Sequence, residues 1–292
     1  MRPVSIGAIS FINTLPIYHL FQPNELESLV YASPASLNQF VAAGKLEISP
    51  VSSAHYLRHQ RQLLLVPGLS VSSPGAVESV LFVSKNPMNH TLLDLPAIMV
   101  PDDSETSIAL LAHLLQQSVK VDFRPWFKSY VAGDYAAALE SSGNALIIGD
   151  HALMMADVLP EEGYYCYDLA DLWFRQTGLP FVFAVWVAQK DWAQTNAETL
   201  QQVTQRLCES REAFFADGTH LEEAVRLAED RCKISPATLR RYFTRSLDFG
   251  WTQAHQSSLT LFSQVIQQLD TLSNGSERDS YTFSRTSSAI PF

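Results

Sequence analysis

The sequence predicts an α/β protein built from two lobes with a ligand cleft between them. Short β-like runs alternate with helical stretches over the first two-thirds of the chain, which is typical of α/β folds with largely parallel strands. With 292 residues, the chain exceeds the usual size of one domain. Two long apolar segments, Gly75–Pro87 and Leu179–Asp191, enclose a separate set of strands and helices. This arrangement indicates one lobe inserted into another through two crossing strands, and clefts between lobes hold small ligands.

Strands are expected throughout the first two-thirds, with helices between them. From Ala197 onward, apolar residues recur at three- and four-residue spacing, so the last third is expected to be helical. In that part, Ser235 and Pro236 predict a helix cap followed by a first-turn proline. The expected strands are Val4–Ile9, Ser28–Tyr31, Glu47–Ile48, Leu63–Val66, Val77–Ser84, Ala97–Val100, Val121–Phe123, Ala145–Ile148 and Phe181–Ala188.

The same pattern gives domain boundaries. Residues 1–85 and 189–270 are expected to form a discontinuous first lobe that includes the helical part. Residues 86–188 are expected to form the inserted second lobe. Residues 271–292 are polar and rich in serine, so they are expected to be a tail that buries too little apolar area to order itself.

Composition excludes several classes of partner. A net charge of −10 argues against a nucleic-acid surface, because phosphate binding needs clustered Lys and Arg. No window approaches the length of a bilayer-spanning helix, and the first residues lack a signal-peptide pattern, so a cytoplasmic protein without a membrane partner is expected. Three widely spaced cysteines give no disulfide framework or paired-ligand spacing. Walker, GxGxxG and HExxH sequences are absent, so no metal or cofactor is expected. The oligomeric state stays open.

Four segments place small polar residues between a strand and a helix: SFINTLP, ISPVSSAHYL, PDDSETSIALLAHLL and IIGDHALMM. Strand ends that face a crevice are where open α/β sheets bind ligands, and helix starts supply free N–H groups. Two such groups of hydroxyls suit a ligand with two carboxylates. Each residue can also be an N-cap only, worth ~1 kcal/mol to its helix. The candidate ligand-binding residues are Ser52, Ser53, Ser104, Thr106 and Ser107.

Two further polar residues stand at unexpected places. Asn13 lies between an apolar strand and an apolar helix. Ser79 lies within an expected strand, on the face shared with Val77 and Leu81, where a hydroxyl is unusual. Its side chain either points into the cleft or bonds a neighbouring carbonyl.

Two charged residues are ambiguous. Asp150 opens a helix, which favours an N-cap; its alternatives are a proton donor or a hydrogen-bond partner of the opposite lobe. Arg175 precedes a turn that leads back across the hinge. It is expected to be a solvated charge at the lobe edge, with contact to a ligand carboxylate as the alternative.

The chain resembles the chorismate dehydratase family (MqnA) of the futalosine menaquinone pathway. The resemblance rests on INTLP, PVSSAHY, GAVESVLFVS, SETSIALLAHLL, LIIGD-AL and W…TGLPFVFAVW, which occur in the family's order at matching distances and cover the chain up to Ser273. It implies a two-lobed fold like the type II periplasmic solute-binding proteins. It also implies conversion of chorismate to 3-[(1-carboxyvinyl)oxy]benzoate and water without a metal or redox cofactor.

Carried over to this sequence, the resemblance places Asn13 and Ser79 on the family's active-site amide and hydroxyl, and Thr106 and Ser107 on its ligand-facing helix start. Glu105 stands where the family has a small residue, and it is expected to point outward, away from a dianion. The base stays open between the substrate's own enolpyruvyl carboxylate and an enzyme group. Two other functions are weighed: a non-enzymatic small-anion-binding protein and the related dihydroxynaphthoate synthase.

Overall fold

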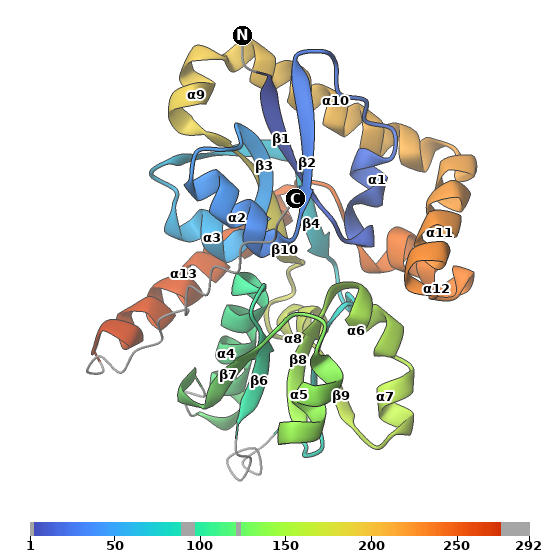
Figure 1. The fold of residues 1–292 in the computed structure, drawn as a ribbon. Coiled ribbons are helices and arrows are strands. Elements are labelled where there is room, and N and C mark those ends of the chain that lie inside the picture. The colour runs from blue at the N-terminus through green and yellow to red at the C-terminus, as the bar shows by residue number, and fades with distance from the viewer. Residues whose placement is uncertain (1–2, 89–96, 121–123, 276–292) are drawn as a thin grey trace, which may run out of the picture.

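The computed structural model describes residues 3–88, 97–120 and 124–275. They form two lobes, each built on a five-stranded sheet with helices packed against it (Figure 1). The predicted two-lobed α/β class is therefore confirmed. Within these residues, no helix combines the length and apolar character needed to cross a bilayer.

The first lobe contains the N-terminal strands. Its strands follow the order β2-β1-β3-β10-β4 across the sheet. Strand β1 runs parallel to β2 and β3, whereas β10 runs antiparallel to β3 and β4. The bounds are β1 Val4–Ile9, β2 Glu27–Ala32, β3 Ile48–Ser52, β4 Leu63–Ser73 and β10 Phe181–Gln189.

The second lobe repeats this arrangement. Its order is β7-β6-β8-β5-β9, with β6 parallel to β7 and β8, and β5 antiparallel to β8 and β9. In each sheet four of the five strands run in the same direction, which confirms the expectation of largely parallel strands. The exception is the strand that follows a crossing between lobes, β10 in the first sheet and β5 in the second, which runs antiparallel to both neighbours. The bounds are β5 Val80–Ser84, β6 Ile98–Pro101, β7 Phe127–Tyr130, β8 Asn144–Ile148 and β9 Tyr165–Asp168.

Each of the two crossing strands belongs to the lobe opposite to the one expected from the sequence. Strand β5 belongs to the second sheet and β10 to the first. The chain therefore crosses before β5, near residues 74–79, and again before β10, near residues 169–180, instead of at 85–86 and 188–189. Hydrophobicity marked both strands correctly, but it does not indicate with which sheet a long apolar strand pairs.

Strands β7 and β9 were not expected from the sequence because each is only four residues long and partly exposed. The expected strand at 121–123 lies outside the described residues. The helices of the first two-thirds lie between strands: α1 Leu15–Tyr18, α2 Pro34–Ala42, α3 Ser53–Arg58, α4 Glu105–Val119, α5 Tyr135–Ser142, α6 Gly149–Met155, α7 Val158–Glu161 and α8 Leu169–Thr177, with short 3₁₀ turns η1 Ile12–Thr14 and η3 Arg124–Trp126.

The helical C-terminal third is confirmed. The Ser235 hydroxyl accepts a hydrogen bond from the Thr238 amide at 3.2 Å, with Pro236 in the first turn, as expected. The last helix continues to Gly275, beyond the expected start of the tail, and residues 276–292 lie outside the described part. The elements are α9 Lys190–Thr195, α10 Ala197–Ala216, α11 Gly218–Cys232, α12 Pro236–Arg241, the π-helical turn η4 Tyr242–Ser246 and α13 Gln253–Gly275.

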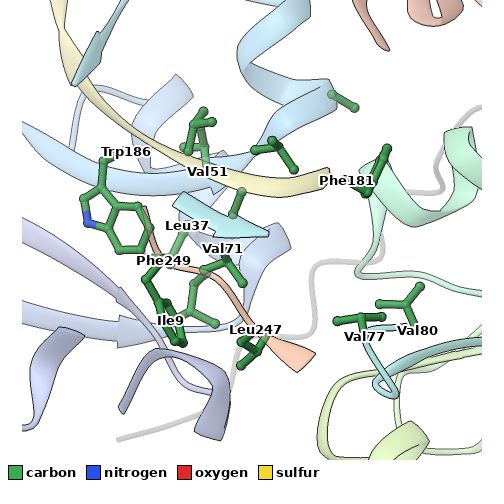
Figure 2. Packing of buried hydrophobic residues seen from close by; sticks show 14 of the residues in the cluster. Ile9, Leu37, Val51, Val71, Val77, Val80, Phe181, Trp186, Leu247 and Phe249 are labelled. Carbon is green, nitrogen blue, oxygen red and sulfur yellow. The ribbon is translucent and has the colours of Figure 1, made fainter. Parts of the chain in front are cut away.

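One apolar cluster extends through both lobes. Figure 2 shows part of it, including Trp186 and Val71 from the first sheet, Leu247 after η4 and Val80 from the second sheet. Trp186 is fully buried, and its indole N–H donates to the Tyr18 hydroxyl at 3.1 Å. Apolar contact across the crossing region holds the lobes against each other, so the polar residues beside it occupy a fixed position.

Candidate active site

A pocket lies between the two lobes. Residues of both lobes line it, and clefts between lobes are where small molecules commonly bind. The first lobe contributes η1, the end of β3 and part of β10, and the second contributes residues 77–80, 103–107 and 148–149. Six of the seven predicted site residues line it: Asn13, Ser52, Ser79, Ser104, Thr106 and Ser107. Ser53 does not.

Asn13 reaches the pocket because the chain turns sharply after β1. The Thr14 hydroxyl donates to the carbonyl of Ile9 at 2.9 Å, and Pro16 starts α1 immediately afterwards. Asn13 Oδ1 is buried and has no hydrogen-bond partner among the described residues. A 180° flip of the amide would put its NH2 group there instead, so this position offers a ligand either an acceptor or two donors. An unpaired buried polar atom costs about 1–3 kcal/mol, which a ligand can recover.

Ser79 lies just before β5, outside any strand, so the strand-face prediction for it is wrong. It is only 4% exposed, and its hydroxyl accepts a hydrogen bond from the Tyr242 hydroxyl at 2.9 Å. Its carbonyl accepts from the Gly149 amide at 2.8 Å. Since its oxygen already accepts from Tyr242, the Ser79 O–H is free to donate into the pocket.

The residue before Ser79 is strained. Glu78 has φ of +64°, a left-handed conformation that a non-glycine residue seldom adopts. Its carboxylate accepts from Arg241 at 2.6 Å and from Ser246, and its amide donates to Asp168 Oδ2 at 2.6 Å. Burial alone would raise the Glu78 pKa, but the bonds from Arg241 and Ser246 outweigh it and lower the pKa. Backbone strain held by many contacts is typical of functional sites.

At the start of α3 the serine hydroxyls serve the protein itself. Ser52 caps the helix by accepting from the His55 amide at 3.3 Å, and it also accepts from Asn38 Nδ2 at 3.0 Å. The buried Ser53 hydroxyl donates to the Val182 carbonyl at 2.7 Å. Ser52 therefore forms pocket wall, while Ser53 ties α3 to β10.

At the start of α4 two of three hydroxyls are left free. Ser104 and Ser107 line the pocket, and neither hydroxyl forms a hydrogen bond with the described part of the chain. The Thr106 hydroxyl accepts from the Ala54 amide at 2.9 Å, which links the second lobe to the first. The 15 residues of α4 also direct the positive end of a helix dipole at the pocket.

Glu105 does not point outward as expected, because it lines the pocket. Its carboxylate is paired with Arg58 at 2.5 Å and lies 3.5 Å from His55 Nδ1. Burial alone would raise the pKa of Glu105, but the contacts with His55 and Arg58 outweigh it and lower the pKa. Arg58 also pairs with Asp270 at 2.8 Å, so its positive charge is shared between two carboxylates.

Asp103 was missed by the sequence analysis. It lines both the interlobe pocket and a second cavity in the same lobe, which Tyr130 and His151 also line. Asp103 Oδ1 is buried without a hydrogen-bond partner among the described residues. Burial, with the nearby Asp102 charge, raises the pKa of Asp103 to about 6. The available signal was its place between strand and helix in PDDSETS, but burial cannot be read from that segment.

The two ambiguous charges are now placed. Asp150 makes no N-cap bond; its Oδ1 accepts from the Ile12 amide at 3.3 Å and its Oδ2 from Cys232 Sγ at 3.4 Å, both in the first lobe. The favoured cap is therefore wrong, and the interlobe contact is correct. Arg175 is 72% exposed and pairs with Asp171 at 2.7 Å, which confirms a solvated lobe-edge charge.

Similarity to solved structures supports the fold. A crystal structure of an Archaeoglobus fulgidus protein matches with a TM-score of 0.71 at 15% identity, covering 92% of this chain and 98% of that one. The periplasmic aliphatic sulphonate binding protein SsuA of Escherichia coli matches with a TM-score of 0.64 at 16% identity, covering 94% and 88%. The chain thus has the periplasmic-binding-protein fold.

Sequence similarity is more specific. A chorismate dehydratase of Thermus thermophilus is 31% identical over 255 residues, which are 83% of this chain and 88% of that protein. A family model described as menaquinone biosynthesis matches residues 4–268, so it spans both lobes and every residue of the pocket. This chain belongs to the menaquinone biosynthesis family.

Proposed function

We propose that the protein is a chorismate dehydratase, which removes water from chorismate to give 3-[(1-carboxyvinyl)oxy]benzoate. The observation that carries this proposal is the interlobe pocket with unpaired polar groups, in a chain 31% identical to a protein of that activity. Asn13 and Asp103 each keep a buried oxygen without a partner there. Buried polar atoms without partners are few in native proteins, and two of the four in the described residues belong to residues that line this pocket.

Chorismate is a dianion, and the α4 start suits one of its carboxylates. Ser104 and Ser107 have free hydroxyls, and the first amides of a helix lack internal partners. The negative charge of Glu105 is partly offset by Arg58, which also pairs with Asp270. We place the ring carboxylate of chorismate at this end of the pocket.

Dehydration removes the proton from C3 and the hydroxyl from C4, which makes the ring aromatic. Negative charge from C3 spreads toward the ring carboxylate, so fixed donors at α4 would stabilise the transition state more than the ground state. The Ser79 hydroxyl and the Asn13 amide line the same pocket and would orient the remaining polar groups. Neither is a strong base, so the substrate's own enolpyruvyl carboxylate takes the C3 proton in this proposal.

Asp103 would supply the proton for the departing hydroxyl. The C3–H electron pair forms the new double bond, the C4–O bond breaks, and the hydroxyl takes the Asp103 proton to leave as water. The protonated enolpyruvyl group then returns one proton to the Asp103 carboxylate, directly or through solvent. A neighbouring dianion favours the neutral carboxyl, whose pKa burial already raises to about 6.

The direct test is incubation of purified protein with chorismate, followed by mass spectrometry and ultraviolet absorbance. The proposal predicts an aromatic enolpyruvyl ether that is lighter than chorismate by one water. A folded protein that binds chorismate without converting it would instead support the alternative of a small-anion-binding protein, which the similarity to a sulphonate-binding protein favours. Turnover without added metal or nucleotide, unaffected by a chelator, is expected.

We also propose a cytoplasmic location. Cys166, Cys208 and Cys232 are free thiols, and free thiols are usual in reducing compartments. The activity of the Thermus thermophilus relative is a biosynthetic one, which fits the same compartment. Labelling of accessible thiols in intact and lysed cells would test this location.

A further inference from the structure

We propose that His19, His220 and Glu223 form a zinc site on the surface of the first lobe, outside the interlobe pocket. Over residues 3–88, 97–120 and 124–275, they are the one group of three His, Cys, Asp or Glu side chains whose ligand atoms all lie within 4.8 Å of one another. None of the three lines the interlobe pocket.

The three ligands come from two separate helices. His220 and Glu223 are three residues apart on α11, a spacing that puts both on one face of the helix. His19 directly follows α1 and packs against them, with 6.0 Å between its ring centroid and that of His220. The His19 side chain is only 15% exposed, so its position is fixed by packing.

The distances suit tetrahedral coordination. His19 Nε2 lies 3.1 Å from Glu223 Oε2, and His220 Nδ1 lies 3.4 Å from the same oxygen. Two ligand atoms bound about 2.0–2.1 Å from one tetrahedral zinc ion lie about 3.3 Å apart. Both distances to Glu223 are close to this value, and the two histidine nitrogens lie within 4.8 Å of each other.

The donor types also suit zinc. Two imidazoles and one carboxylate are common zinc ligands, and the partial exposure of His220 and Glu223 leaves water access to a fourth position.

A bound ion would join α1 to α11. Helix α1 directly follows η1, which carries Asn13, and α11 ends at Cys232, which contacts Asp150 across the lobes. The ion would therefore stiffen the part of the first lobe that presents Asn13. It would not touch the substrate, so a chelator should lower the thermal midpoint and leave turnover at 25 °C unchanged.

The test is calorimetric titration of the purified, chelator-treated protein with zinc chloride at neutral pH. We expect one ion per chain for the wild type. The H220A variant should bind at least roughly 100-fold more weakly, since even loss of an outer-shell partner costs about 10–100-fold. The matched control is Glu222→Gln, which removes a carboxylate from the neighbouring position of α11, where it pairs with Arg240, and should bind zinc like the wild type.

Thermal midpoints give a second readout that does not depend on activity. Zinc should raise the midpoint of the wild type and of E222Q, but not that of H220A. Absence of zinc binding by the wild type would overturn the proposal, as would binding that H220A retains. None of these measurements uses chorismate, so the proposal stands or falls separately from the enzymatic one.

Discussion

The starts of α3 and α4 have similar sequences and opposite uses. Both place serines between a buried strand and a helix, one in each lobe, and the two helix starts meet where the Ala54 amide donates to the Thr106 hydroxyl. At α3 the Ser52 and Ser53 hydroxyls are bonded to the protein. At α4 the Ser104 and Ser107 hydroxyls remain free. A strand–serine–helix pattern therefore identifies residues that can lie beside a pocket. Only the hydrogen bonds of each serine hydroxyl show whether it is available to a ligand.

The largest expected effect is at Asp103, whose Oδ1 is buried without a hydrogen-bond partner in the described part of the chain. Replacing Asp103 with Asn removes the proposed proton donor while keeping its shape. Turnover of chorismate should fall by roughly 10²-fold or more, as for other positioned acids. The matched control is Asp102→Asn, an exposed neighbour whose Oδ1 accepts from Ala132, and near-normal turnover is expected there. Equal losses in both variants would contradict the assignment.

The same variant makes a prediction about pH and stability. Folding raises the pKa of Asp103 from 3.8 to about 6. As the pH rises between these values, the unfolded chain loses the Asp103 proton more readily than the folded chain, so the free energy of unfolding falls. At pH 8 the Asn variant should be more stable than the wild type, by on the order of 2 kcal/mol. At pH 4 the folded carboxyl is already neutral, so most of the difference should disappear. Thermal melts of the wild type and the Asn variant at both pH values test this. The same stability difference between the two proteins at pH 4 and pH 8 would contradict the prediction.

A pair of buried amides sharpens the comparison next. Asn13 keeps an unpaired oxygen in the pocket, whereas Asn38 bonds Ser52 through both ends of its amide, at 3.0 and 3.1 Å. Asn13→Ala should lower turnover by roughly 10²-fold with little change in the thermal midpoint. Asn38→Ala should do the reverse and cost about 1–3 kcal/mol of stability. Similar stability losses in both would mean that Asn13 is structural.

The same substitution can be made in a serine at each of the two helix starts. Ser53→Ala removes a hydroxyl that donates to the Val182 carbonyl, so we expect about 1 kcal/mol of lost stability and normal turnover per folded molecule. Ser104→Ala should leave the thermal midpoint unchanged and raise KM roughly tenfold, since its hydroxyl serves a ligand in this account. Unfolding curves and KM values would be measured for both variants. A stability loss in Ser104→Ala together with a raised KM in Ser53→Ala would contradict these roles.

The smallest effect concerns contact between the lobes. Asp150→Ala removes the bond to the Ile12 amide, which should weaken the contact between the lobes and raise KM roughly threefold to tenfold, with kcat little changed. Arg175→Ala, at an exposed lobe edge, is the control and should have no effect. A loss in kcat of Asp150→Ala with unchanged KM would place this residue in the chemistry instead.

The sequence was sufficient for the two-lobed class and for most of the pocket wall, because strand ends and serine-rich helix starts are local features. It was insufficient for Asp103 and Asp150, whose surroundings depend on contacts that form only when distant segments pack. Ile12 and Cys232, which contact Asp150, are far apart in the chain. The assignment of β5 and β10 to their lobes was wrong for the same reason, because the strands with which they pair are distant in the sequence.

The most direct test of the central claim is a crystal structure with 3-[(1-carboxyvinyl)oxy]benzoate bound. The account predicts that the ligand lies in the interlobe pocket, with polar atoms within hydrogen-bonding distance of Asn13, Asp103 and at least one of Ser104 and Ser107. It also predicts that the Ser53 hydroxyl keeps its bond to Val182. A ligand bound elsewhere, or one that leaves Asn13 and Asp103 without a contact, would contradict the account.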